Sequence, residues 1–291
     1  MSKKELNKDN NTILLIDTSY CCFYRWTALQ NWIKLNMKDK VFDDDYMYSE
    51  DEIFMEKYDK RFWEGFIPIM KSFNIEKKNI LFAIDCPRDS IWRVKHYPDY
   101  KKTRSLSSDI KQKDCKNIFM HTINELLPKF KKDHNINYIR SDGAEADDIV
   151  ATAVKYIREK DENCKIIIIA NDHDYLQLID ENLEIYALAS TVKKMKLIND
   201  KSIGTGKENL LFKILKGDSS DNIKSPFKKC GDKTALKYVH SEEELEKAFK
   251  KNPGSEEKFN LNKLIIDFNE IPDYITKDIT NQLENTSLLN L

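Results

Sequence analysis

The stretch SDGAEADDIVATAVKYIREKDENCKIIIIANDHDY, residues 141–175, decides the fold. Its first acidic cluster, residues 145–148, precedes apolar residues at helical spacing, which predicts a helix that begins with carboxylates. Its second cluster, residues 171–174, directly follows the apolar run 166–170, which predicts a buried strand that ends in aspartates. Carboxylates crowded in this way repel one another, and hard divalent cations such as Mg²⁺ or Mn²⁺ compensate that charge best. The stretch therefore predicts a metal-dependent active site.

Two further predicted strands also end in an aspartate. Residues 13–17 read Ile-Leu-Leu-Ile-Asp, and the apolar run from residue 80 ends in Asp85. In open α/β sheets the ligand site lies beyond the carboxyl ends of the strands, so three strands ending in Asp point to one site. The other expected elements are strands 137–140 and 183–188 and helices 20–35, 60–73, 115–132 and 207–216.

Two segments of opposite charge lie between these elements. Residues 38–59 are acidic and are expected to form a solvated loop or insertion. Residues 86–116 hold nine basic side chains with Trp92, Tyr97 and Tyr100 interleaved. Bases for phosphates and aromatic rings for stacking are typical of a segment that threads single-stranded nucleic acid. A solvated loop with buried aromatic rings would give the same pattern.

The composition excludes several classes of protein. The 48 Lys and Arg residues nearly balance the 49 Asp and Glu residues, but a net charge of −1 hides how charge is distributed. Six cysteines without a C-x-x-C pair argue against zinc and against a disulfide framework. The polar start and the lack of a long apolar run predict no signal peptide and no membrane span. We therefore expect an intracellular protein, cytoplasmic or nucleoid-associated.

The C-terminal half contains a further acidic turn and the predicted start of a helix. Residues 217–223, Gly-Asp-Ser-Ser-Asp-Asn-Ile, place Asp218 and Asp221 in a turn. Residues 227–237 then predict a turn that opens a helix. Backbone amides at such a helix start can hold a phosphate, and the neighbouring lysines add positive charge.

Four motifs, residues 15–17, 84–104, 145–174 and 217–223, together resemble the 5′-nucleases of the flap endonuclease superfamily. The chain is most similar to phage flap endonucleases, the RNase H of T-even phages and the 5′-nuclease domain of bacterial DNA polymerase I. The resemblance implies an α/β fold, a PIN-like three-layer α/β/α core with a mainly parallel sheet. It also implies a helical arch at about 86–116 and a C-terminal helix–turn–helix region. We expect a catalytic core at 1–205 and a helical DNA-binding region at 206–291.

The resemblance further implies a Mg²⁺-dependent, structure-specific 5′-nuclease that uses two metal ions, with Mn²⁺ as a substitute. The implied metal ligands are Asp17, Asp85, Glu145, Asp147, Asp148, Asp172, Asp174, Asp218 and Asp221. Lys101 and Arg104 would contact and polarise the scissile phosphate. The implied nucleic-acid contacts are Arg93, Lys95, Tyr100, Lys102, Lys228, Lys229, Gly231, Lys233 and Thr234. The turn at 229–231 often binds K⁺ in this family, but Lys229 replaces its usual first glycine, so the sequence leaves K⁺ binding open.

The expected partner is branched or nicked DNA with a free 5′ end, and an RNA primer paired with DNA is a further candidate substrate. The chain is expected to act as a monomer, with any replication protein bound in trans. A non-catalytic binder of branched DNA with the same fold is the alternative function. The complete set of acidic residues favours the enzyme. A PIN-type ribonuclease toxin fits less well, because such chains are shorter and lack the 216–240 element.

Overall fold

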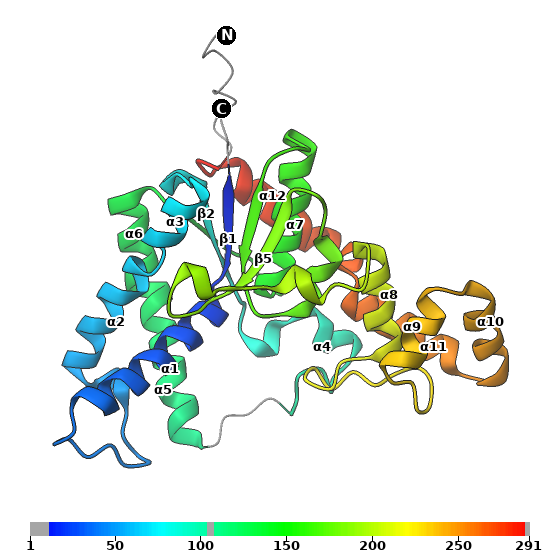
Figure 1. Cartoon of the computed structure of the whole chain (residues 1–291), viewed down its shortest axis with the longest axis horizontal. Helices are drawn as coiled ribbons and strands as arrows, with labels where there is room; N and C mark the ends of the chain where they lie inside the picture. Colours follow the sequence, from blue (N-terminus) through cyan, green and yellow to red (C-terminus); the bar gives the residue numbers. More distant parts are fainter. Residues whose placement is uncertain (1–11, 104–107, 289–291) are drawn as a thin grey trace, which may run out of the picture.

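A six-stranded sheet in the order β3-β2-β1-β4-β5-β6 forms the centre of the computed structural model, which describes residues 12–103 and 108–288 (Figure 1). Strands β1 to β5 run parallel, and β6 pairs antiparallel with β5. Their bounds are β1 Ile13–Asp17, β2 Ile80–Ile84, β3 Asn137–Arg140, β4 Ile166–Ile169, β5 Leu183–Ala187 and β6 Lys196–Leu197. The chain passes from β1 to β2 and β3 on one side and places β4 and β5 on the other. The topological switch point therefore lies between β1 and β4, where ligands bind in such folds.

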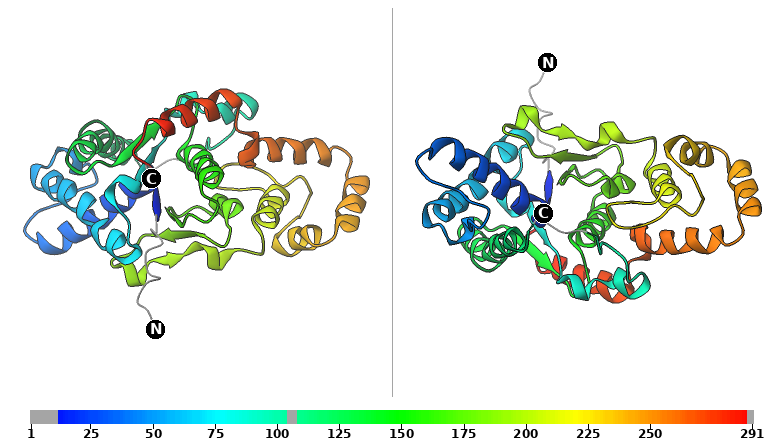
Figure 2. Two further views of the ribbon diagram at one scale, coloured as in Figure 1. Left: turned by 90° about the horizontal axis from the view of Figure 1, so that it is seen from above. Right: turned by 90° about the horizontal axis from the view of Figure 1, so that it is seen from below.

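Helices cover both faces of the sheet, which confirms the predicted α/β class (Figure 2). Successive strand residues point to opposite faces. Ile13 and Leu15 of β1 therefore pack with α7 (Ala146–Lys160) and α12 (Asp273–Glu284). Leu14 and Ile16 face the other layer. That layer contains α1 (Thr18–Asn36), α2 (Glu52–Glu64), α3 (Ile67–Phe73), α5 (Asp109–His121) and α6 (Leu127–His134).

The prediction of a loop throughout the acidic segment 38–59 is wrong. A short 3₁₀ helix spans Tyr48–Glu50, and α2 begins at Glu52 with Asp51 as its N-cap. Phe54 and Tyr58 lie four residues apart, so both face the core, while Glu56 between them is exposed. The helix predicted at 60–73 is instead the end of α2 followed by α3. The helix predicted at 115–132 is α5 and α6, joined by a π-helical turn at Thr122–Leu126.

The helices α8 to α11 lie beside one end of the core, away from α1 and α2 (Figure 1). Their bounds are α8 Gly206–Lys216, α9 Asp232–Val239, α10 Glu242–Lys251 and α11 Ser255–Ile266. They share a small apolar core around Leu215 and Phe227. Helix α12 then returns to pack on α7 and β3. The predicted division at residue 205 coincides with the start of α8, and separate domains stay a prediction.

The turn that follows α8 depends on a glycine. Gly217 has φ +76°, and a Cβ there would lie 2.6 Å from the carbonyl oxygen of Ile223. Asp218 and Ile223 exchange backbone hydrogen bonds of 2.9 and 2.7 Å across the turn. Any larger residue would strain this backbone, so Gly217 fixes where Asp218 and Asp221 lie.

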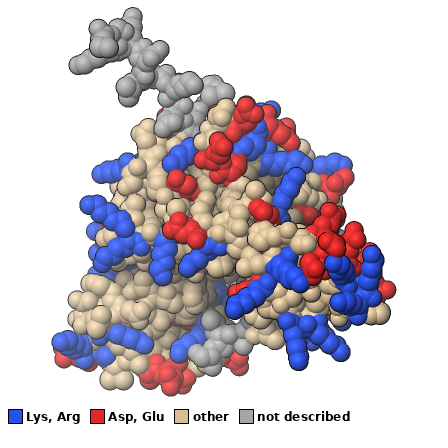
Figure 3. Space-filling view, turned by 45° about the vertical axis from the view of Figure 1, so that its right-hand side comes forward, with Lys and Arg blue, Asp and Glu red and all other residues tan. Residues whose placement is uncertain are grey.

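Basic and acidic side chains are interspersed on the face of the molecule shown in Figure 3. This arrangement agrees with a net charge of −1. Within residues 12–103 and 108–288, no helix combines the length and apolar character needed to cross a bilayer. All six cysteines lie within the described residues and none forms a disulfide there; five of them are buried.

Candidate active site

A cavity of about 260 Å³ opens at the carboxyl ends of β1, β2 and β4. The structure thus brings together the aspartates that end three predicted strands. Residues from α1, from the start of α7 and from the loop after α4 (Trp92–His96) complete its wall. Its charged lining residues are Asp17, Asp85, Lys101, Glu145, Asp147 and Asp172.

Helix starts hold the carboxylates in the cavity. Asp17 is the N-cap of α1 and accepts a hydrogen bond of 2.9 Å from the backbone N–H of Tyr20. Asp85 accepts a hydrogen bond of 2.8 Å from the N–H of Ala146, the first residue of α7, and another from the hydroxyl of Ser19. The positive end of each helix dipole therefore faces the acidic cavity and stabilises its negative charge.

The cavity still holds more negative charge than the helix starts compensate. Burial, and then the neighbouring Asp85 carboxylate, raise the pKa of Asp17 to about 7. Burial also raises the pKa of Asp85 and raises the pKa of Asp147 well above its ordinary value. Carboxyls with raised pKa values release protons when a cation binds, so this donor set suits a hard divalent ion.

In the absence of metal, Asp17→Asn should therefore stabilise the protein at high pH. The pKa of Asp17 is higher in the folded protein than in the unfolded chain, so protonation of Asp17 favours folding at low pH. This contribution to the free energy of unfolding is complete below the unfolded-state pKa and is lost as pH rises from about 4 to about 7. We expect the free energy of unfolding of the variant to exceed that of wild type by roughly 1–3 kcal/mol at pH 8 and to equal it at pH 4. The gain is modest because Asp17 keeps some contact with solvent. Asparagine also retains the helix cap.

Denaturant unfolding in EDTA at pH 4, 6 and 8 measures this difference. Adding Mg²⁺ at pH 8 should stabilise wild type more than Asp17→Asn and so narrow the gap, because bound metal stabilises the folded state in proportion to its affinity. A gap that stays constant with pH would contradict the raised pKa of Asp17.

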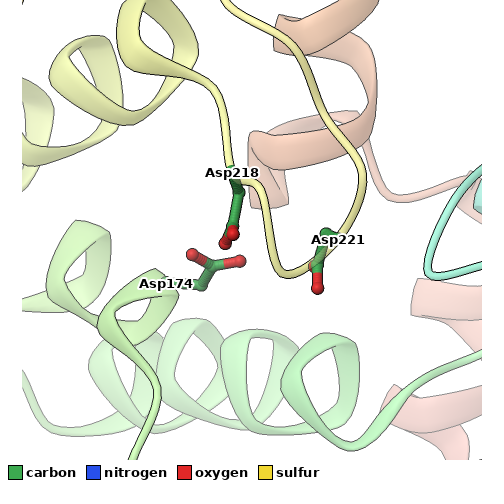
Figure 4. A group of neighbouring side chains, drawn as sticks. All are labelled: Asp174, Asp218 and Asp221. Atoms are coloured by element: carbon green, nitrogen blue, oxygen red, sulfur yellow. The ribbon is translucent and has the colours of Figure 1, made fainter. Parts of the chain in front are cut away.

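A second acidic cluster lies beside the first cavity. Figure 4 shows the carboxylates of Asp174 and Asp218 next to each other with that of Asp221 to one side, and one oxygen from each of the three lies within 4.8 Å of the others. Asp174 belongs to the 3₁₀ helix His173–Leu178 after β4, and the other two belong to the turn after α8. Lys213 of α8 contacts Asp174 and lies 2.7 Å from Asp218. Burial raises the pKa of Asp218, but Lys213 and the hydrogen bonds from Ser220 together outweigh burial and hold that pKa below its ordinary value.

Lys101 connects the two acidic groups. Its Nζ lies 2.5 Å from Glu145 and 3.8 Å from Asp221. Its backbone has φ +53°, and its N–H donates a hydrogen bond of 2.9 Å to the carbonyl oxygen of Asp221. Burial raises the pKa of Glu145, but Lys101 and Arg93 outweigh burial, so the pKa of Glu145 lies below its ordinary value. Lys101 is therefore held as a cation between the two groups of carboxylates.

The predicted nucleic-acid contacts of Arg93 and Tyr100 do not fit the structure. Arg93 is 1% exposed, and its guanidinium donates two hydrogen bonds to Asp148, of 2.7 and 2.9 Å, and one of 3.0 Å to Glu145. Tyr100 is also buried, and its hydroxyl donates to Glu145. Neither side chain has a surface to offer DNA. Both instead support Glu145 from behind the cavity.

The prediction that Asp148 binds metal does not fit either. Asp148 is fully buried and does not line the cavity. Besides Arg93, it accepts hydrogen bonds of 3.0 Å from the indole N–H of Trp92 and from the backbone N–H of Glu145. Its two oxygens are committed to these donors. Its role in this structure is to neutralise Arg93 and to fix the first turn of α7.

The other predicted nucleic-acid contacts lie on the surface. Lys95, Lys102, Lys228, Lys229, Gly231 and Lys233 are exposed, and Thr234 is partly exposed in the first turn of α9. Lys229 has φ +57°, the left-handed conformation that glycine adopts most easily, at the point where the family usually has its first glycine. Arg104 lies outside the described residues. Nucleic-acid binding by these residues stays a prediction.

Several residues of the site were not predicted from the sequence, among them Ser19, Tyr175 and Lys213. Ser19 donates to Asp85, and the hydroxyl of Tyr175 lies 3.3 Å from Asp17. Lys213 contacts the second cluster from α8. Ser19 and Tyr175 lie within three residues of a predicted aspartate, which was a usable signal. Lys213 had none, because its contact depends on how α8 packs.

The comparisons with known proteins agree with this architecture. The family described as 5′-3′ exonuclease, N-terminal resolvase-like domain, matches residues 12–205. A 5′-3′ exonuclease of Mycoplasmopsis pulmonis (strain UAB CTIP) is 30% identical over 242 residues, which cover 75% of this chain and 74% of that protein. Ribonuclease H of Enterobacteria phage T4 is 27% identical over 236 residues, covering 74% of this chain and 75% of the relative.

Solved structures from bacteriophage T5 share the fold. A T5 protein co-crystallised with metal ions aligns over 95% of this chain and 100% of its own, with a TM-score of 0.65 and 14% identity. The T5 flap endonuclease in a complex with DNA and metal ions aligns over 94% of this chain and 100% of its own, with a TM-score of 0.60 and 15% identity. The predicted PIN-like α/β fold is thereby confirmed. The chain belongs to the 5′-3′ exonuclease family and is a nuclease.

Proposed function

We propose that this nuclease is a Mg²⁺-dependent, structure-specific enzyme that hydrolyses phosphodiester bonds at or near a free 5′ end of branched or nicked DNA. The observation that carries the proposal is the meeting of strand-end and helix-start carboxylates in one cavity, with a second acidic cluster beside it. The relatives support it, because bacteriophage T5 proteins of the same fold were crystallised with metal ions and with DNA.

The donor atoms fit two hard divalent ions. The cavity offers only oxygen ligands near its raised-pKa carboxyls, which is the chemistry that Mg²⁺ and Mn²⁺ prefer. One ion would be held by Asp17, Asp85, Asp147 and Asp172, and a second by Asp174, Asp218 and Asp221. When bound, such ions supply a hydroxide nucleophile and stabilise the charge that develops on the leaving 3′-oxygen.

Lys101 is placed to act on the scissile phosphate. Its ammonium lines the cavity between Glu145 and Asp221. A phosphate that binds at the metal site formed by the cavity carboxylates would therefore also contact Lys101. The transition state carries more negative charge on the phosphate than the ground state does. A fixed positive charge there therefore stabilises the transition state more than the ground state. Lys101 would thus contribute to the rate more than to DNA affinity.

Lys101→Ala should therefore lower kcat by about 10²–10³-fold, the range found for a single donor that stabilises a transition state. Its Kd for flap DNA should change much less. Lys102→Ala is the matched control, since its side chain is 71% exposed and pairs only with Asp99 among the described residues. That variant should keep kcat and show weaker, more salt-sensitive binding. Equal losses of kcat and affinity in Lys101→Ala would make Lys101 a binding residue.

Cleavage of a 5′-labelled flap substrate tests the function directly. We expect cutting near the junction in Mg²⁺, and none in Ca²⁺ alone or in Mg²⁺ with excess EDTA. Replacing the 5′ segment with RNA measures activity on primer-like substrates. Binding without cleavage in both Mg²⁺ and Mn²⁺ would instead support a non-catalytic binder of branched DNA.

We further propose that the protein acts as a monomer, in the cytoplasm or nucleoid, and meets replication proteins only in trans. The site supports this view because one copy of the chain supplies all of the clustered carboxylates. Sedimentation of the protein with and without flap DNA would show a dimer if a second copy were needed.

A further inference from the structure

Lys213 places an ammonium group inside the second acidic cluster. Its Nζ contacts Oδ1 of Asp174 and lies 2.7 Å from Oδ2 of Asp218. The side chain is 17% exposed, so the charge is held mostly out of water. The same two carboxylates offer the oxygens that a divalent ion would use. Lysine and metal thus compete for one set of ligands.

The cluster needs such a cation to be stable. Asp174, Asp218 and Asp221 bring one oxygen each within 4.8 Å of the others, and like charges at that distance raise the free energy of the folded state. A lysine ammonium is a compact point charge with three donors on a flexible stem, and it can satisfy two carboxylates at once. Helix α8 holds it in place, because a capping box between Thr205 and Glu208 fixes the start of that helix.

The lysine also has space into which it can withdraw. A hollow of about 220 Å³ adjoins the cluster and is lined by Lys213 itself and by His173, Lys201, Phe212 and Ser219. Of these lining residues, Lys201 and His173 are exposed to solvent. A rotation of the four-carbon stem would move the ammonium away from Asp174 without moving α8.

We propose that Lys213 is a built-in counter-cation, which occupies the second carboxylate cluster when no divalent ion is bound and must withdraw before one binds. This inference rests on the proposed metal-dependent function. It goes beyond that function by making the affinity of the second site depend on a residue that is not a metal ligand. The lysine keeps the metal-free fold intact and weakens metal binding by the cost of its own displacement.

Calorimetric titration of metal-free protein with Mn²⁺ tests the proposal. Lys213→Met removes the charge but keeps an unbranched side chain. Lys207→Met is the control, since Lys207 is exposed on the same helix, α8, and lines neither the cluster nor the hollow. If the ammonium of Lys213 leaves the cluster only in a minor state, Lys213→Met should tighten one Mn²⁺ binding event by about tenfold or more, whereas Lys207→Met should leave both binding events unchanged.

Unfolding temperature in EDTA supplies a second readout that needs no metal. Lys213→Met should unfold at a lower temperature than wild type, and adding Asp218→Asn to it should restore part of the loss by removing one of the repelling charges. Should the single variant not fold without metal, recovery in this double variant supports the proposal and lack of recovery overturns it.

The outcomes separate this inference from the proposed function. Equal or weaker Mn²⁺ binding by Lys213→Met, with wild type still binding two ions, would overturn the counter-cation and leave the nuclease proposal intact. Wild-type protein that binds no divalent ion at all would overturn both.

Discussion

Asp172→Asn should reduce cleavage of flap DNA by at least about 10³-fold, more than the loss of a single transition-state donor. Asp172 follows β4 and lines the cavity, where it is one of the carboxylates proposed to hold metal. Its Oδ1 accepts a hydrogen bond of 2.9 Å from the N–H of Asp174. Asparagine has the same shape and keeps that acceptor, so the substitution removes a negative charge without opening the turn.

Measurements on this variant should separate chemistry from binding. Single-turnover cleavage in Mg²⁺ gives the rate, and fluorescence anisotropy in Ca²⁺ gives the Kd for the same flap, which we expect to stay within about threefold of wild type. Asp142→Asn is the control, because Asp142 is exposed, lies three residues before Glu145 in the sequence and does not line the cavity. Cleavage by Asp172→Asn within tenfold of wild type, with Asp142→Asn unchanged, would show that Asp172 is not an essential ligand.

The position of Asp172 could be predicted because local pattern and topology coincide there. A run of isoleucines is apolar on both faces, as a central parallel strand must be, and its end is marked by the first two polar residues, Asn171 and Asp172. The same reasoning applies to Asp17 and Asp85. Parallel strands then bring these ends to one edge without further information. Strand-end carboxylates are therefore the part of the site that one sequence can specify.

Arg93 and Asp148 could not be predicted in this way. A basic residue between Trp92 and Tyr97 has the composition of a nucleic-acid-binding segment, but composition does not report burial. The partners of Arg93 lie far along the chain, with Asp148 separated by 55 residues and Ile265 by 172. A charge pattern read along the chain cannot distinguish a cation that faces DNA from one that neutralises buried carboxylates. Only the packing of α4 against α7 and α11 decides between them.

The prediction for the acidic segment 38–59 was wrong for the opposite reason. The sequence contained a usable helix signal, but the charge pattern was given more weight. Tyr48, Phe54, Tyr58 and Phe62 all pack into one apolar core. The last three are spaced by four residues, as one face of a helix requires. The surrounding aspartates and glutamates suggested a solvated loop, yet charged side chains on the outer face are normal for an amphipathic helix. The periodicity of the aromatic residues was the stronger indicator.

Arg93→Met should destabilise the protein by about 3–5 kcal/mol, the usual effect of removing one partner from a buried ion pair. The guanidinium is surrounded by Asp148 and Glu145, and its Nε donates a hydrogen bond of 2.8 Å to the carbonyl oxygen of Ile265 at the end of α11. Methionine fills a similar volume but leaves the buried Asp148 carboxylate without a cation and leaves Glu145 with Lys101 alone. Arg93→Lys should recover part of the loss only, since an ammonium cannot replace the paired hydrogen bonds of the guanidinium.

Urea unfolding measures this effect, with Lys95→Met as the control from the same helix, because Lys95 is exposed. The pH dependence gives the decisive check. Arg93 helps to hold the pKa of Glu145 below its ordinary value of 4.5, so this part of the stability is present above that pH and is lost as pH falls through the lower, folded-state pKa. The gap between wild type and Arg93→Met should therefore narrow in acid. Equal stability of the two proteins at neutral pH would mean that the carboxylates behind the cavity do not need Arg93. The active-site wall would then have to be held together by the packing of α4 and α11 alone.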